Sequence, residues 1–123
     1  MSHIVFDTSA LLQLMDQGSA DPRLADAMVS AVAVAEVLEV LISRGVALPE
    51  AMAALMTTGI HIVDYSYEHA TAQGRLFQSA PDAAYSAAER AGMALALVLD
   101  ATLVTADPAL LAAAGLGVRV AAL

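Results

Sequence analysis

The stretch Ile4-Val5-Phe6-Asp7-Thr8-Ser9-Ala10-Leu11 decides how we expect this chain to fold. A short run of strand-favouring apolar residues leads directly into an acid, and a helical pattern of apolar residues then continues to Met15. Aspartate and threonine are both good helix N-cap residues, so Asp7 or Thr8 should begin that helix. The stretch therefore predicts a strand over residues 3–6 that ends at a carboxylate and turns at once into a helix.

The same order of strand, acid and helix returns near the end of the chain. Thr102-Leu103-Val104-Thr105 favours a strand, and Asp107-Pro108 should begin a helix to about Ala114. Further strands are expected over residues 60–64 and 118–120, and the segment 28–34 fits either a buried strand or a helix start. Other helices are expected over residues 22–27, 35–44, 50–58, 67–79 and 84–99, with breaks at Gly18-Ser19, Gly45 and Gly59.

Strands that alternate with helices predict a parallel sheet covered on both faces. We therefore expect a single α/β domain over residues 1–123, with four to five parallel strands between two layers of helices. The carboxyl ends of parallel strands lie at one edge of such a sheet, where ligands usually bind. A membrane span needs about 20 apolar residues. The uncharged run between Glu50 and Asp64 has only 13 residues, so we expect none there.

The charged residues exclude several classes of enzyme. All 5 basic residues are arginine, so the chain lacks the lysine that P-loop, pyridoxal-phosphate and kinase sites require. The 13 acids give a formal charge of −8, which repels phosphate backbones and favours basic partners or bound cations. There is no cysteine, which excludes disulfides and thiolate metal sites. The first residues lack the features of a signal peptide, so we expect the protein in the cytoplasm.

Four acids need an explanation: Asp7, Glu36, Glu89 and Asp107. Asp7 and Asp107 follow strands, where each could serve simply as a helix N-cap. Glu89 begins an almost wholly apolar helical segment, where the positive helix end alone could favour it. Glu36 lies nearer its helix start than Glu39, which we assign to the surface. At one edge of a sheet the four like charges would need a divalent cation, and oxygen ligands suit Mg²⁺ or Mn²⁺.

These segments resemble the motifs of PIN-domain ribonucleases, and most closely those of the VapC toxins of bacterial toxin–antitoxin pairs. Residues 4–11 are similar to the opening motif of the family, and Ser30–Glu36 to the short strand that leads to its second acid. Tyr85–Ala91 matches the stretch with the third acid, although Glu89 stands where the family usually has aspartate. Leu103–Asp107 resembles the fourth motif. The motifs occur in the family's order and cover essentially the whole chain.

The resemblance implies a three-layer PIN domain that hydrolyses RNA phosphodiesters with a water activated by Mg²⁺ or Mn²⁺. Its catalytic and metal-binding residues would be Asp7, Glu36, Glu89 and Asp107. Thr8, Ser9 and Thr105 flank these acids and would either hydrogen-bond to them or cap helices. Arg90 is the candidate RNA contact, with an ion pair to a nearby acid as the alternative.

The expected partners are an RNA substrate, a basic antitoxin protein and a second copy of the chain. A homodimer is expected because hydrophobic residues make up 59% of the sequence, which leaves little polar surface for a monomer. The resemblance to VapC toxins implies the same.

Two other functions stay open. One is a PIN-like binding module with weak catalysis. The other is a phosphoaspartate protein, although a receiver domain needs a lysine and a haloacid-dehalogenase-type phosphatase needs an aspartate where Ser9 stands.

Overall fold

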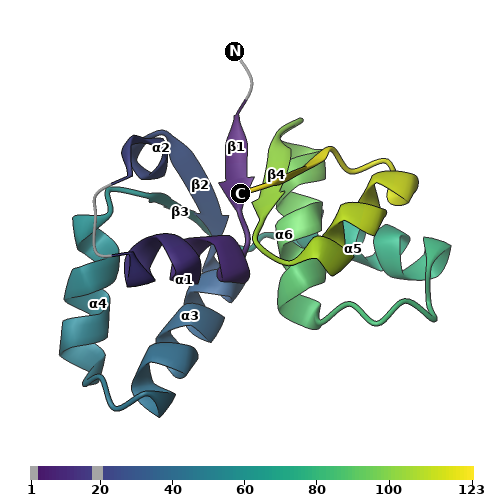
Figure 1. Ribbon diagram of the computed structural model, residues 1–123. Coiled ribbons are helices and arrows are strands. Elements are labelled where there is room, and N and C mark those ends of the chain that lie inside the picture. The colour runs from purple at the N-terminus through teal and green to yellow at the C-terminus, as the bar shows by residue number, and fades with distance from the viewer. Residues whose placement is uncertain (1–2, 18–20) are drawn as a thin grey trace.

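Five parallel strands form one sheet at the centre of this computed structural model, which describes residues 3–17 and 21–123 (Figure 1). The predicted helix break at Gly18-Ser19 lies outside the described residues. The elements follow one another as β1 (Ile4–Phe6), α1 (Thr8–Asp16), α2 (Pro22–Ala25), β2 (Ala27–Ser30), α3 (Ala31–Ser43), α4 (Leu48–Thr57), β3 (His61–Val63), α5 (Tyr67–Ser79), α6 (Ala87–Val98), β4 (Thr102–Thr105), the 3₁₀ helix η1 (Pro108–Leu116) and β5 (Val120–Ala122).

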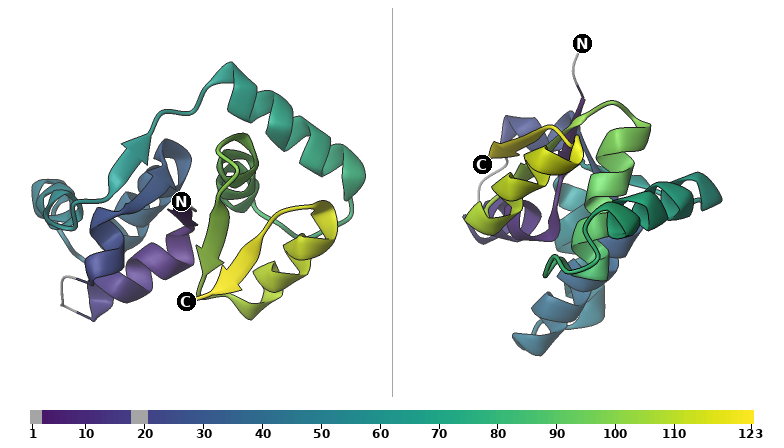
Figure 2. Two further views of the ribbon diagram at one scale, coloured as in Figure 1. Left: turned by 90° about the horizontal axis from the view of Figure 1, so that it is seen from above. Right: turned by 90° about the vertical axis from the view of Figure 1, so that its right-hand side faces the viewer.

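Helices cover both faces of the sheet, as the sequence predicts (Figures 1 and 2). Side chains alternate across a strand, so β1 contributes to two separate cores. Phe6 packs with the core formed under α1 to α4, whereas Val5 packs with the core formed under α5, α6 and η1. Both side chains are fully buried. The three layers therefore meet through a sheet that is apolar on both sides, as parallel sheets are.

In the strand order β3-β2-β1-β4-β5, the first three strands are added toward one edge of the sheet and the last two toward the other. The point at which this order changes lies between the parallel strands β1 and β4. From β1 the chain moves outward to β2 and β3, and from β4 it moves the other way to β5. Connections of this kind leave a crevice at the carboxyl ends of the two central strands, where ligands bind in open α/β sheets. Asp7 directly follows β1, and Asp107 lies two residues after β4.

The ambiguous segment 28–34 contains both a strand and a helix start. β2 ends at Ser30, and α3 begins at the next residue because the Ser30 side chain accepts a hydrogen bond from the backbone N–H of Val32. Glycines with positive φ follow the next two helices, Gly45 after α3 (91°) and Gly59 after α4 (73°), which confirms the predicted helix ends.

Several predicted boundaries are wrong. The last strand is Val120–Ala122 and not residues 118–120, because Leu103 of β4 pairs with Val120, while Val118 is buried in the turn before the strand. The helix predicted over 84–99 begins only at Ala87, since its N-cap is Ser86. The helix after Asp107 is a 3₁₀ helix that extends to Leu116. The short helix predicted over 22–27 ends at Ala25, because Ala27 already belongs to β2.

Among the helices of residues 3–17 and 21–123, none combines the length and the apolar character that crossing a membrane would require.

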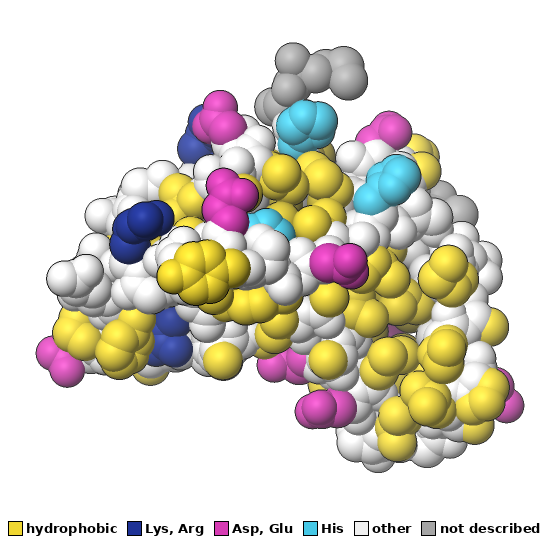
Figure 3. Space-filling view, turned by 180° about the vertical axis from the view of Figure 1, so that it is seen from behind, with side chains coloured by type: hydrophobic (Ala, Val, Ile, Leu, Met, Phe, Trp, Pro, Cys, Tyr) yellow, Lys and Arg dark blue, Asp and Glu magenta, His cyan; other side chains and the backbone are white. Residues whose placement is uncertain are grey.

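One face of α4 exposes a row of apolar side chains. Leu48, Met52 and Met56 are spaced four residues apart, so they lie on the same side of the helix, and they are 47%, 51% and 70% exposed. Ile42 of the neighbouring α3 is 46% exposed. Figure 3 shows hydrophobic side chains gathered over the end of the molecule that α3 and α4 form.

We predict that this face joins two copies of the chain in solution. At micromolar concentration, sedimentation should give a species of twice the 12.6 kDa chain mass. Met56→Glu should shift the population toward the monomer, because it places a charge among apolar side chains, and Met56→Leu should not. A wild-type chain that sediments as a monomer would contradict the dimer. Equal behaviour of the two variants would place the dimer interface elsewhere.

Candidate active site

Asp7 is the central carboxylate of the candidate site. It caps α1 and is only 4% exposed, at the carboxyl end of β1. Its Oδ1 accepts hydrogen bonds from the backbone N–H of Ala10 (2.8 Å) and from Ser9 Oγ (2.7 Å). Its Oδ2 accepts one from Thr105 Oγ1 (2.5 Å). Donors from two separate parts of the chain therefore hold this buried carboxylate, which satisfies the requirement that a buried charge be hydrogen-bonded.

Thr105 connects Asp7 to Asp107. The Thr105 hydroxyl oxygen accepts a hydrogen bond from the backbone N–H of Asp107 (3.0 Å) while its proton goes to Asp7. Ser9 Oγ likewise accepts from the backbone N–H of Ala106 (3.0 Å). The two hydroxyl oxygens approach to 3.2 Å, but each hydroxyl has one proton. Both protons point to the Asp7 carboxylate, so the two hydroxyls form a cradle around it.

Asp107 is the N-cap of η1. Its Oδ1 accepts a hydrogen bond from the backbone N–H of Ala109 (3.0 Å), and its side chain is half-buried. Its Oδ2 has no hydrogen-bond partner among residues 3–17 and 21–123. The N-cap interpretation of Asp7 and Asp107 is therefore confirmed, and at Asp107 the second carboxylate oxygen stays available for a ligand.

Glu36 and Glu89 lie on helices that start at the same edge of the sheet. α3 begins directly after β2, and Glu36 lies in its second turn, half-buried, whereas Glu39 is exposed as predicted. α6 leads into the parallel strand β4, so it runs opposite to the strands and begins at their carboxyl ends. Glu89 forms a capping box there: its carboxylate accepts from the N–H of Ser86 (2.7 Å), and its own N–H donates to Ser86 Oγ (3.0 Å).

The four acids share an edge, but they do not meet as one set of ligands. Within the part of the chain that the structure describes, no group of three or more histidine and acidic side chains is close enough to hold a metal ion. Asp7 and Asp107 are linked through Thr105, while Glu36 and Glu89 are not hydrogen-bonded to either. Three of the four acids each cap a helix through one oxygen.

The donor chemistry of these residues nevertheless suits a hard divalent cation. Asp107 Oδ2, Glu89 Oε2 and both carboxylate oxygens of Glu36 make no hydrogen bond within the described ranges. These are anionic oxygens, the ligands that Mg²⁺ and Mn²⁺ prefer. A bound cation would also relieve the repulsion among carboxylates gathered at one edge. The residues fit such an ion chemically, provided that the glutamate side chains turn toward Asp7 and Asp107.

The other residues predicted to support the site behave differently from one another. Ser9 and Thr105 both donate to Asp7, the first of the two alternatives that the sequence left open. Thr8 is the first residue of α1 and is half-buried, but the structure gives its side chain no hydrogen bond within the described residues. The helix cap is therefore Asp7 and not Thr8.

Positive charge is scarce near the acids. Three arginines form exposed ion pairs with aspartates, and in one of these the hydrogen bonds from Arg23 lower the pKa of Asp21. Arg90 forms no ion pair with Glu89. Its guanidinium lies 5.0 Å from the centre of the Phe77 ring and donates weakly to the carbonyl of Ala83 (3.5 Å). Arg90 is therefore held against α5 by an aromatic ring.

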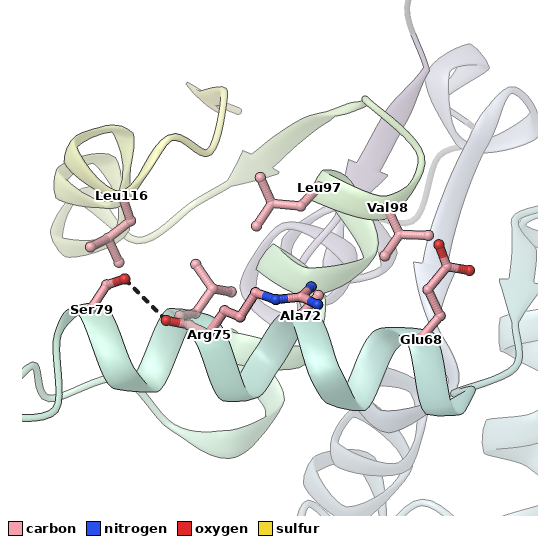
Figure 4. A pocket seen from close by; sticks show the side chains of 8 residues that line it. Glu68, Ala72, Arg75, Ser79, Leu97, Val98 and Leu116 are labelled. Atoms are coloured by element: carbon pink, nitrogen blue, oxygen red, sulfur yellow. Dashed lines mark hydrogen bonds between the residues drawn. The ribbon is translucent and has the colours of Figure 1, made fainter.

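The remaining arginine, Arg75, belongs to α5. It lines a groove of about 380 Å³ between α5, the end of α6 and η1 (Figure 4). Leu97 and Val98 of this groove are at the end of α6, whereas Glu89 is at its start. Eight residues of helix separate Leu97 from Glu89, a distance of about 12 Å along the axis. Within the described residues, Arg75 forms no ion pair with any of the four acids.

A small depression, which was not predicted from the sequence, adjoins Asp7 and Asp107, called the acid pair below. Its volume is about 110 Å³, and Thr105 and Asp107 form one of its walls. Gln13 of α1 forms another wall. The signal for Gln13 was its spacing, since it follows Ser9 by four residues and so lies on the same side of the helix. The other lining residues are Ala106, Pro108, Leu111, Ala122 and Leu123.

Solved structures share this arrangement of sheet and helices. A chain of DNA-bound VapBC from Salmonella typhimurium superposes with a TM-score of 0.77 at 13% identity, covering 99% of this chain and 98% of that one. VapC20 from Mycobacterium tuberculosis, described as a sarcin–ricin loop cleaving toxin, gives 0.71 at 18% identity, covering 89% and 94%. VapBC2 from Rickettsia felis, bound to a promoter DNA fragment, gives 0.77 at 15%, covering 98% of each chain. This chain has the fold of the VapC toxins.

The likeness is one of three-dimensional structure. No protein-family model matches the sequence, and no curated protein matches it either. The expected fold, a three-layer PIN-type α/β domain, is therefore confirmed by the architecture and by these VapC neighbours.

We predict that the Thr105 hydroxyl stabilises the fold through Asp7. Thr105→Val keeps the side-chain shape but removes the donor to a buried carboxylate, which should lower the free energy of unfolding by about 1–3 kcal/mol. Thr102→Val in the same strand is the matched control, because the Thr102 side chain has no hydrogen bond in the described structure, and it should change stability by less than about 0.5 kcal/mol. Urea unfolding measures both. Equal losses would show that the hydroxyl is not the cause.

Proposed function

We propose that this chain is a cytoplasmic, Mg²⁺-dependent endoribonuclease and the toxin of a toxin–antitoxin pair. The observation that carries the proposal is the fixed Asp7 carboxylate beside Asp107, at the point where the strand order changes in a sheet with the VapC fold. One protein of this fold is described as a sarcin–ricin loop cleaving toxin. Mn²⁺ could replace Mg²⁺, since both prefer oxygen ligands.

Each acid has a distinct task in this mechanism. Ser9 and Thr105 hold the Asp7 carboxylate in one orientation at the carboxyl end of β1. Asp107 presents Oδ2, and Glu36 and Glu89 add charge from α3 and α6. When bound, the divalent cation supplies the positive charge and the water activation that phosphodiester hydrolysis needs. The scarcity of arginine near the acids makes that charge necessary, because an all-carboxylate edge repels phosphate.

Covalent catalysis through serine or aspartate finds little support. Ser9 donates its proton to Asp7 and accepts from Ala106 N–H, so no histidine activates it. His69 is buried in α5, where its Nδ1 accepts from the backbone N–H of Ser66 (3.4 Å). Both oxygens of Asp7 are engaged, which disfavours Asp7 as the nucleophile of a phosphoaspartate protein.

A catalytically weak binding module is the second candidate function. It is favoured by the use of three of the acids as helix caps and by the lack of a preformed three-ligand group among the described residues. A calorimetric Mg²⁺ titration combined with an RNA cleavage assay distinguishes the two, since the module would bind RNA or protein without turnover.

A basic antitoxin is the proposed protein partner. The formal charge of −8 attracts a basic chain, and salt should screen that attraction. An arginine of the partner would compete with the cation for the carboxylates. An apolar groove of about 390 Å³ between α1, α2, α3 and α4 could take the partner's apolar side chains. VapBC complexes are among the structures that share the fold.

We predict that Asp7→Asn and Asp107→Asn abolish cleavage without unfolding the chain. Asparagine keeps the cap hydrogen bond but loses the charge that would hold the cation. Turnover of single-stranded RNA in Mg²⁺ should fall roughly hundredfold or more in each variant. Asp82→Asn is the matched control, because Asp82 is exposed in the turn between α5 and α6. Full activity of either site variant at saturating Mg²⁺ would remove that residue from the mechanism.

We also predict that RNA binding needs the divalent cation. In EDTA at physiological salt, fluorescence anisotropy with a labelled single-stranded RNA should give a Kd at least roughly tenfold weaker than in Mg²⁺. The reason is that most arginines are paired or distant, so few cations remain for phosphates. Gel analysis of the RNA after each measurement controls for cleavage. Tight binding in EDTA would show that the argument from charge is wrong.

A further inference from the structure

The depression beside Asp7 and Asp107 has apolar side chains in its lining, whereas the site itself consists of carboxylates and hydroxyls. Apolar side chains of Pro108, Leu111 and Leu123 line it together with the polar side chains of Gln13, Thr105 and Asp107, and Leu111 is 40% exposed. Its volume of about 110 Å³ is well above the roughly 30 Å³ share of one water molecule and below the several hundred Å³ of a typical ligand cavity. The size, and a lining that combines apolar side chains with polar groups, suit a single flat ring system with a polar edge.

Gln13 contributes a neutral amide to the lining of this depression. It lies one helical turn after Ser9, whose hydroxyl contacts Thr105 and Ala106, so α1 turns the same side toward the start of η1. The Gln13 side chain is exposed, and the structure shows no hydrogen bond to its amide within residues 3–17 and 21–123. A donor and an acceptor are thus presented beside an apolar surface, with no internal partner.

We infer that this depression binds the nucleobase next to the scissile phosphate and that the Gln13 amide reads the edge of that base. The inference rests on the proposed ribonuclease function. Thr105 and Asp107 form both the wall of the depression and the edge of the acid pair, so its occupant is adjacent to a phosphate held there. The flat face of the base lies on Leu111 and Pro108, and its polar edge meets Gln13.

The chemistry of the amide sets an expected preference. A glutamine side chain pairs in a bidentate manner with a base that offers a donor beside an acceptor, as adenine does with its amino group and N7. A glutamate at this position accepts only, so it favours bases that offer donors, such as the amino group of cytosine. Gln13 is therefore a specificity-determining residue, which contacts the base and leaves the reacting phosphate to the acids.

The first experiment is cleavage of a randomised single-stranded RNA pool in Mg²⁺, with sequencing of the product ends. Wild-type protein should favour one base class at a position flanking the cut by roughly tenfold or more. Gln13→Ala should flatten that preference, and Gln13→Glu should move it toward cytosine or guanine. Gln17→Ala is the matched control, one turn further along α1 and outside the depression, and it should keep the wild-type profile.

A second experiment measures binding without turnover. Adenosine 5′-monophosphate should shift the backbone NMR signals of Leu111 and Leu123 in wild-type protein, whereas ribose 5-phosphate, which lacks the base, should not. Ala122→Leu should abolish the shifts, because Ala122 lines the depression and a larger side chain fills it. Gln13→Ala should weaken them, and Gln17→Ala should leave them unchanged.

The outcomes separate the inference from the function on which it rests. Cleavage with a base preference that Gln13→Ala leaves intact overturns the inference and keeps the ribonuclease. Equal shifts with both phosphates overturn it as well, since the base would then contribute nothing. In a third outcome, the protein fails to cleave RNA while adenosine 5′-monophosphate still causes base-dependent shifts that Ala122→Leu removes. That result would support the base site and overturn the proposed ribonuclease function.

Discussion

A buried carboxylate tied to two distant parts of the chain organises this molecule. The hydrogen bonds that Asp7 accepts from Ser9, Ala10 and Thr105 join the β1–α1 turn to the end of β4. An ionised carboxylate at 4% exposure would be costly without these donors. The described structure contains no buried side-chain oxygen or nitrogen that lacks a partner. The contact that closes the centre of the sheet is thus also the contact that orients the candidate catalytic acid.

Local sequence patterns predicted most of the fold. The stretch from Ile4 to Leu11 predicted β1, the cap at Asp7 and α1, because strand preference, capping and helical periodicity all depend on residues close together in the sequence. The bounds of β5 could not be predicted from local sequence patterns. Its register comes from pairing with β4, a contact across many residues, so Val118 resembled a strand residue although it is buried in the turn before the strand.

The candidate site was predicted in its parts and less well in its geometry. Ser9 and Thr105 hydrogen-bond to Asp7, which is one of the two alternatives that the sequence left open, because residues that flank the ends of neighbouring strands come together. Glu89 was expected either to stabilise a helix start or to bind a metal ion. One of its carboxylate oxygens forms the capping box with Ser86, and the other oxygen remains available for a cation. Gln13 was not predicted, because its spacing of four residues from Ser9 becomes informative only once the residues across the depression are known.

The short outer strands have a consequence for whether neighbouring molecules can extend the sheet. β3 and β5 form the two edges of the sheet, and each has only three residues. An open edge is a template on which another chain can add a strand, and a short edge offers too few backbone groups to hold it. Growth of the sheet from molecule to molecule is therefore suppressed. Fibril-like aggregation is disfavoured even though hydrophobic residues make up 59% of the sequence.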